Sequence, residues 1–224
     1  VTPKDAHTGI MIYSLHDQKE IFRYRAHSKF TPASTLKVVT TLAALDHWGP
    51  EHRFATKYKT NSYKKGVIQD LIIEASGDPS ITTERILKTV SGLQARGVKE
   101  ITGDIIIDNS LFTKQLGPPK SINYYHALST PFAVNQNLFK LIAKKIDQNM
   151  VVSIDPPIPY LVLQHKNGAQ KKWWQIHRSF QKDREFVTVT GSTKNEMVRE
   201  VTVLNPLLYA GETIKWSLNK MGIS

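Results

Sequence analysis

The chain has 224 residues, no cysteine and a formal net charge of +11, from 30 Lys and Arg against 19 Asp and Glu. Its apolar fraction of 40% and charged fraction of 22% are ordinary for a globular protein and exclude a disordered or fibrous class. The lack of cysteine excludes disulfides and thiol chemistry, and no run approaches the about 18 apolar residues of a membrane span. The basic residues lie in scattered pairs, so we interpret the charge as a solvated surface that also suits contact with a membrane or an anionic wall polymer.

The N-terminal part of the sequence predicts a hairpin followed by a helix. Residues 9–24 alternate apolar and polar side chains across a polar turn, which is typical of two antiparallel strands. Residues 36–48 are apolar on nearly every side, which predicts a buried helix. Pro32 places the start of this helix at or just before Ser34, because proline is tolerated in the first helical turn and rejected later.

The middle of the chain predicts a second hairpin and a strand, helix, strand unit. Residues 54–74 contain two strand-like stretches around a polar turn at residues 61–66. Residues 83–96 carry apolar side chains on one helical face, with Gly97 as a stop, and residues 101–108 form an apolar run of strand length.

The last third predicts mainly short strands. Residues 138–146 fit either a helix or a strand, and a final helix is expected at residues 206–221. Between them, strands are expected at residues 160–163, 173–176, 186–190 and 198–204.

A Ser-x-x-Lys pattern, Ser34 and Lys37, lies at the start of the apolar helix. Residues three apart share a helix face, so the lysine amine can reach the serine hydroxyl and, if burial lowers the pKa of the lysine, accept its proton during attack on a carbonyl. Free N–H groups at the helix start would stabilise the resulting oxyanion. The spacing alone leaves open that Ser34 is an ordinary N-cap and Lys37 a solvated lysine.

Residues 30–41 strongly resemble the active-site segment of class C low-molecular-weight penicillin-binding proteins, the DacB-like D-alanyl-D-alanine carboxypeptidase/endopeptidases. Three further segments agree in order and spacing. Residues 77–81 resemble the family's Gly-Asp-Pro turn, residues 103–112 its Gly-Asp strand and Asp-x-Ser-x-Phe segment, and residues 209–223 its helix ending in Gly-Ile.

The resemblance implies an α+β fold: a partial penicillin-recognising (β-lactamase/transpeptidase-like) domain with an inserted α/β domain. Residues 1–53 and 204–224 would belong to the serine peptidase domain, and residues 54–203 to the insertion. It implies a hydrolase of peptidoglycan stem peptides in which Ser34 is the nucleophile and Lys37 its base, also acylated by β-lactams. No cofactor is implied.

An extracytoplasmic or periplasmic location follows from the same resemblance. Residues 1–5 include no Met and no apolar segment, so we expect an export signal to have been removed already.

The other two elements of a penicillin-recognising site, an S-x-N loop and a K-T-G strand, are not evident. The sequence has no K-T-G, and its S-x-N matches, Ser121-Ile122-Asn123 and Ser217-Leu218-Asn219, are interpreted as chance. We therefore expect the chain to stop before those elements and to be nearly inactive in isolation. A catalytically incompetent homologue that serves as a peptidoglycan-binding or scaffold protein is the alternative.

Asp108 and Phe112 match the family segment that approaches the cleft from the inserted domain, where they would contact the side chain of the diamino acid in the stem peptide. The alternative is a strand end and a core aromatic. The eight histidines form no metal-binding spacing, so no metal site is expected. Trp173-Trp174 among basic residues is interpreted as a half-buried strand and not as a nucleic-acid site, and Asp78 is expected to cap local backbone.

Overall fold

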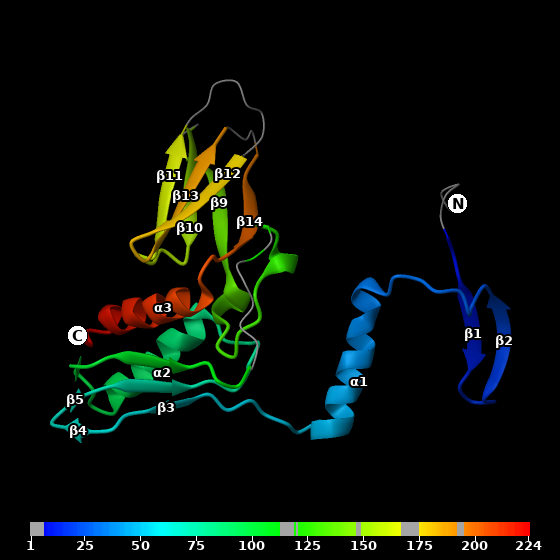
Figure 1. Cartoon of the computed structure of the whole chain (residues 1–224), viewed down its shortest axis with the longest axis horizontal. Coiled ribbons are helices and arrows are strands. Elements are labelled where there is room, and N and C mark those ends of the chain that lie inside the picture. Colours follow the sequence, from blue (N-terminus) through cyan, green and yellow to red (C-terminus); the bar gives the residue numbers. More distant parts are fainter. Residues whose placement is uncertain (1–6, 113–118, 120, 147–148, 167–174, 192–194) are drawn as a thin grey trace. The chain divides into compact units, whose positions relative to one another are not determined.

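The computed structural model describes residues 7–112, 119, 121–146, 149–166, 175–191 and 195–224. The chain divides into two compact units, Val1–Arg53 and Phe54–Ser224, and each is described by itself. Both mix helices and strands (Figure 1), which confirms the α+β class.

The first unit contains the predicted hairpin and the predicted helix. Strands β1 (Ile10–Ser14) and β2 (Lys19–Tyr24) pair antiparallel, with an irregularity in register after Ile12. A single 3₁₀ turn, η1 (Ala33–Thr35), leads into α1 (Leu36–Trp48), which ends at a glycine with φ of +75°. Both predicted elements are confirmed.

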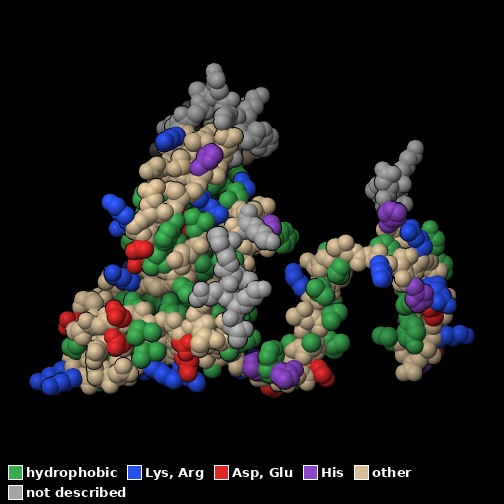
Figure 2. Space-filling model, viewed as in Figure 1, with side chains coloured by type: hydrophobic (Ala, Val, Ile, Leu, Met, Phe, Trp, Pro, Cys, Tyr) green, Lys and Arg blue, Asp and Glu red, His purple; other side chains and the backbone are tan. Residues whose placement is uncertain are grey.

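The prediction that α1 is buried is wrong. No residue of this helix is buried, and Val38 and Leu42 are 70% and 66% exposed. The apolar residues point to all sides of the helix, an arrangement that needs packing partners all round, and the first unit is too small to supply them. Figure 2 shows the resulting hydrophobic side chains on the surfaces of α1 and of the hairpin.

The first half of the second unit is built around α2 (Thr83–Ala95). Its N-cap, Thr82, accepts a hydrogen bond from the N–H of Arg85, and Gly97 stops the helix in the left-handed region with φ of +88°. Short strands flank it in two three-stranded sheets, ordered β3-β6-β8 and β4-β5-β7. The strands are β3 (Lys57–Lys59), β4 (Tyr63–Lys64), β5 (Val67–Ile68), β6 (Leu71–Glu74), β7 (Glu100–Ile101) and β8 (Ile105–Asp108).

Parallel pairing of β6 with β8 and of β5 with β7 confirms the predicted strand, helix, strand unit. The strand predicted at residues 101–108 is divided in two, because Gly103 and Asp104 turn back onto the preceding loop. Their N–H groups donate to the carbonyl of Gln69 at 2.7 Å and to Oδ1 of Asp70 at 2.9 Å.

The second half of this unit consists of two further three-stranded sheets, ordered β10-β9-β14 and β11-β13-β12. The strands are β9 (Leu138–Ile146), β10 (Asn149–Asp155), β11 (Leu161–Lys166), β12 (Gln175–Gln181), β13 (Arg184–Thr190) and β14 (Met197–Thr202). The ambiguous residues 138–146 are therefore a strand, and β10 was not predicted. Trp173 and Trp174 lie outside the described residues.

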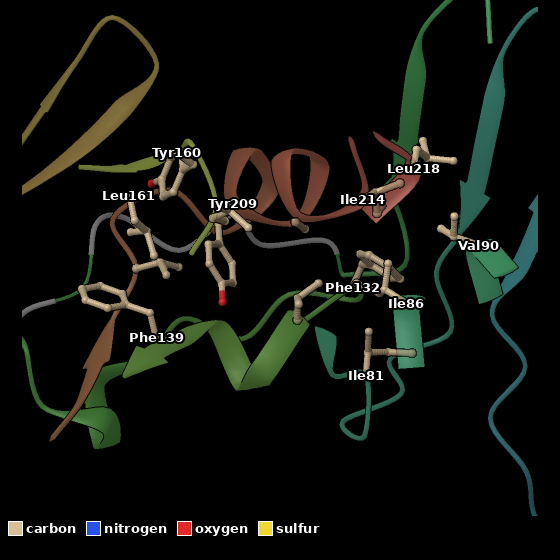
Figure 3. Close-up of a cluster of buried hydrophobic side chains, with 14 of the residues drawn as sticks. Ile81, Ile86, Val90, Phe132, Phe139, Tyr160, Leu161, Tyr209, Ile214 and Leu218 are labelled. Carbon is tan, nitrogen blue, oxygen red and sulfur yellow. The ribbon is translucent and has the colours of Figure 1, made fainter. Parts of the chain in front are cut away.

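Helix α3 (Pro206–Lys220) shares one hydrophobic core with α2 and the strands. Tyr209, Ile214 and Leu218 of α3 lie in the same buried cluster as Ile86 and Val90 of α2 (Figure 3). These apolar side chains of α3 complete the core of the second unit. The assignment of residues 204–224 to the peptidase domain stays a prediction.

Two glycines of the second unit provide a matched test of this backbone. At Gly66 φ is +92°, and an added Cβ would lie 2.7 Å from the carbonyl oxygen of Gly97. We expect Gly66→Ala to lower the free energy of unfolding by about 2 kcal/mol. In contrast, Gly211→Ala, where a Cβ meets nothing within 4 Å inside α3, should raise it by about 0.5–1 kcal/mol. Urea unfolding measures the free energy of unfolding of both variants. Equal changes in the two would contradict the difference in backbone conformation and space between Gly66 and Gly211.

Candidate functional site

Ser34 and Lys37 lie where the 3₁₀ turn η1 passes into α1. Ala33 has φ of +45°, and the carbonyl of Pro32 accepts hydrogen bonds from both the N–H (2.9 Å) and the hydroxyl of Thr35. This turn presents Ser34 immediately before the helix, with Lys37 as the second residue of α1. The two residues are three positions apart, and that their side chains share one face stays a prediction from this spacing.

Both side chains are exposed, and neither has a hydrogen bond or ion pair with a described residue. A serine hydroxyl is a weak nucleophile until a base removes its proton, and a lysine amine serves as a base once it is desolvated. Catalysis by this pair therefore requires that the face of α1 carrying it be covered and that Lys37 Nζ come within hydrogen-bond reach of Ser34 Oγ.

Asp108 ends β8 opposite Glu74 of the parallel strand β6. Hydrogen bonds from Ser110, whose N–H lies 2.9 Å from Oδ1, lower the pKa of the Asp108 carboxyl, and the charge of Lys59 lowers it further. The carboxylate is exposed and carries a full negative charge at neutral pH.

Phe112 lies against the Gly-Asp-Pro turn. A Cβ added at Gly77, where φ is +76°, would lie 3.8 Å from Cε1 of Phe112. The turn is held by Asp78, which accepts hydrogen bonds from the N–H (2.9 Å) and hydroxyl (2.6 Å) of Ser80, and the predicted local capping is confirmed. Two segments that resemble family motifs, residues 77–81 and 103–112, are thus brought together, and Phe112 is 42% exposed.

A charged cluster that the sequence analysis missed lies beside Asp108. Nζ of Lys59 and Nζ of Lys57 lie 2.9 and 3.2 Å from Oε2 of Glu74. Both contacts lower the pKa of Glu74, and the hydrogen bond from Lys59 has the larger effect. The pattern that would have revealed them is the spacing of the two lysines on one strand, since residues two apart share a face.

The serine hydroxyls of the two S-x-N matches form hydrogen bonds with residues close by in the sequence. The hydroxyl of Ser121 is 2.6 Å from Nδ1 of His126, and Ser217, buried in α3, donates to the carbonyl of Thr213 at 2.7 Å. Among the described residues no group of three potential ligands could hold a metal ion. No helix within the same residues has the length and apolar character needed to span a membrane.

Curated relatives of this chain include two D-alanyl-D-alanine carboxypeptidases. The D-alanyl-D-alanine carboxypeptidase of Actinomadura sp. (strain R39) is 28% identical over 110 residues, which are 48% of this chain and 20% of the relative. The D-alanyl-D-alanine carboxypeptidase DacB of Haemophilus influenzae is 28% identical over 117 residues, 50% of this chain and 24% of the relative.

Solved structures show the same fold. Penicillin binding protein 4 (dacB) from Haemophilus influenzae superimposes with a TM-score of 0.75 at 21% identity, over 99% of this chain and 52% of that one. The same protein complexed with a novel beta-lactam gives a TM-score of 0.69 at 21% identity, over 99% and 50%. The chain thus spans about half the length of these solved relatives.

The model of the D-Ala-D-Ala carboxypeptidase 3 (S13) family matches residues 2–224. The match covers all but one residue and agrees with the folds and the relatives above. The chain therefore belongs to the D-Ala-D-Ala carboxypeptidase 3 (S13) family, as its resemblance to the DacB-like enzymes predicted.

Proposed function

We propose that this chain supplies the nucleophile of a serine-type D-Ala-D-Ala carboxypeptidase/endopeptidase that acts on peptidoglycan stem peptides outside the cytoplasm. The observation that carries the proposal is the Ser34-x-x-Lys37 pair at the start of an apolar helix, in a chain that matches the S13 family over residues 2–224. Residues 1–53 and 204–224 are proposed to derive from the peptidase domain, and residues 54–203 from its insertion.

In the proposed reaction, Oγ of Ser34 attacks the carbonyl carbon of the penultimate D-alanine while Nζ of Lys37 accepts the hydroxyl proton. The N–H groups at the helix start stabilise the oxyanion. The peptide C–N bond then breaks, the departing amine takes up a proton, and water hydrolyses the acyl ester. A β-lactam acylates the same oxygen by opening its ring amide, and one solved relative was determined with a beta-lactam.

Asp108 and Phe112 are proposed to recognise the side chain of the diamino acid in the stem peptide. The Asp108 carboxylate is ionised and exposed, so it can accept hydrogen bonds from an ammonium group. Phe112 is partly exposed beside the Gly-Asp-Pro turn and offers an apolar surface to the methylene chain.

A non-catalytic role in peptidoglycan binding or scaffolding is the second candidate. It is favoured by the exposure of Ser34 and Lys37 and by their lack of a partner among the described residues. The two candidates differ in one measurable property, because only the enzyme forms a covalent bond to Ser34.

Labelling with a fluorescent penicillin, in the cells that naturally make the protein, tests the proposal. We expect one adduct, on the tryptic peptide that spans residues 30–37, detected by mass spectrometry. Ser34→Ala should abolish it while leaving the amount of protein unchanged. A penicillin adduct on another residue, or none on a protein that is present and folded, would favour the scaffold.

A further inference from the structure

The second unit contains a cavity of about 340 Å³ whose lining includes neither Ser34 nor Lys37. Ligand pockets of proteins commonly measure about 300–1,000 Å³, so its size suits one small ring system. Its lining includes apolar side chains from Pro79, Ile81, Leu138, Phe139 and Pro156, together with the polar groups described next.

A row of charged side chains crosses the cavity wall. In the sheet β10-β9-β14, Lys140 pairs in register with Asp155 on one side and Glu200 on the other, and all three residues line the cavity. All three are exposed, and in the part of the chain that the structure describes Lys140 forms no ion pair with either neighbour. Donor and acceptor groups thus alternate along the wall and are free to bind a ligand.

Another part of the cavity wall is held in a costly backbone conformation. Asn135 and Gln136 have φ of +50° and +58°, a region that non-glycine residues adopt rarely and often at ligand sites. Asn135 is fixed there by hydrogen bonds of its amide with the N–H of Thr83 (3.0 Å), the hydroxyl of Thr83 (2.8 Å) and the hydroxyl of Tyr209 (2.9 Å). Gln136 is left exposed at the cavity, where its amide adds a further donor and acceptor.

Two tyrosines form an exposed aromatic platform near this wall. Tyr124 and Tyr125, in the turn η2 (Tyr124–His126), have ring centroids 3.9 Å apart with their planes tilted by 32°, and they are 48% and 77% exposed. So large an exposed area on adjacent aromatic rings is unusual unless it serves binding.

The platform lies beside β14 (Figure 1), and Glu200 of this strand also lines the cavity. The hydroxyl of Thr202 donates to the carbonyl of Ser121 at 3.0 Å, and Glu200, two residues earlier, lies on the same strand face. Strand β14 therefore links the platform, through Thr202, to the cavity, through Glu200.

We propose that the cavity and the tyrosine platform bind a neutral sugar residue of a polysaccharide strand. Aromatic faces pack against the C–H faces of sugar rings, and carboxylates and amides bind hydroxyl groups in directed pairs. Three lining carboxylates, Glu84, Asp155 and Glu200, against one amine disfavour anionic ligands.

Calorimetric titration of the chain with chitotriose and with cellotriose, two neutral oligosaccharides, tests this site. We expect saturable binding of at least one of them, weakened about tenfold or more by Tyr125→Ala. The control Tyr24→Ala removes a similarly exposed tyrosine, 52% accessible, from the first unit and should change the Kd less than twofold. Ser34→Ala should leave sugar binding unchanged, so the outcome is independent of the proposed enzyme activity.

A second pair of variants tests the cavity without altering an aromatic ring. Glu200→Gln should weaken sugar binding, whereas Glu212→Gln, which removes the same charge from α3 at a different cavity, should not. Thermal unfolding verifies that each variant is folded. Failure of both sugars to bind at about 10 mM, equal binding by Tyr125→Ala and the unaltered chain, or displacement of the sugar by a lysine-rich peptide would overturn the proposal.

Discussion

Replacing Lys37 with methionine is expected to slow penicillin acylation of Ser34 by roughly 10²–10⁴-fold, the usual contribution of a positioned general base. Methionine keeps the length and much of the apolar stem of the side chain but has no amine. Because Lys37 is exposed and makes no contact with a described side chain, its replacement should leave the free energy of unfolding nearly unchanged. The measurement is the rate of penicillin labelling, by stopped flow or on gels, of the protein as it is made in its natural cells.

Lys29→Met is the matched control for this experiment. Lys29 is exposed and lies five residues before Ser34, so its loss removes the same charge from the same segment without removing the base. An equal effect of the two variants would mean that Lys37 acts through general electrostatics. An unchanged rate in Lys37→Met would assign the proton transfer to another group.

Replacing Arg178 with methionine is expected to destabilise the second unit by about 3–5 kcal/mol. Arg178 Nη1 lies 3.1 Å from Oε1 of Glu185, whose side chain is fully buried, and the same nitrogen donates to the carbonyl of Thr202. Glu185 also accepts hydrogen bonds from the N–H of Leu204 (2.8 Å) and the hydroxyl of Tyr160 (3.2 Å). Without Arg178 a buried carboxylate is left without its counter-ion.

The pH dependence of this loss identifies its cause. Burial raises the pKa of Glu185, and Arg178 opposes that rise. In Arg178→Met the pKa rises further, so a proton neutralises the carboxyl at low pH and the penalty shrinks, whereas it grows as the pH rises through the pKa of the folded state. The destabilisation measured by urea unfolding should therefore be larger at about pH 8 than at about pH 5.

Two further variants complete the test. Arg184→Met removes an exposed arginine from the neighbouring strand and should cost less than about 0.5 kcal/mol. The double variant Arg178→Met/Glu185→Gln, which removes both buried charges and keeps an acceptor oxygen for Leu204 N–H and the Tyr160 hydroxyl, should recover most of the lost stability. A pH-independent loss, or a double variant less stable than the single one, would show that packing and not charge is responsible.

Elements with a strong local pattern were predictable from the sequence. The hairpin at residues 9–24 has a clean alternation, α2 has an apolar face with a capping threonine and a stop glycine, and α3 has a proline in its first turn. The Ser34 and Lys37 pair could be proposed from the sequence, because its spacing and the family resemblance depend only on neighbouring positions, and its catalytic role stays a prediction.

Features that depend on distant partners were not predictable in the same way. β10 has no distinctive alternation and is defined by its pairing with β9. The Lys57–Lys59–Glu74 cluster arises because β3 and β6 pair antiparallel, and the Arg178–Glu185 pair because β12 and β13 do. The exposure of α1 was not predicted, because an apolar helix sequence indicates that the helix requires packing partners but does not show whether its own unit contains them.

Because α1 is apolar and exposed, packing of this helix and the reactivity proposed for Ser34 are coupled equilibria. A 13-residue helix has little stability of its own and draws most of it from packing. Whatever covers α1 therefore orders the backbone that carries Ser34 and, in the same event, dehydrates Lys37. Affinity for that covering surface and reactivity of the serine would rise together, so any change that weakens packing on α1 would also lower the fraction of molecules able to react.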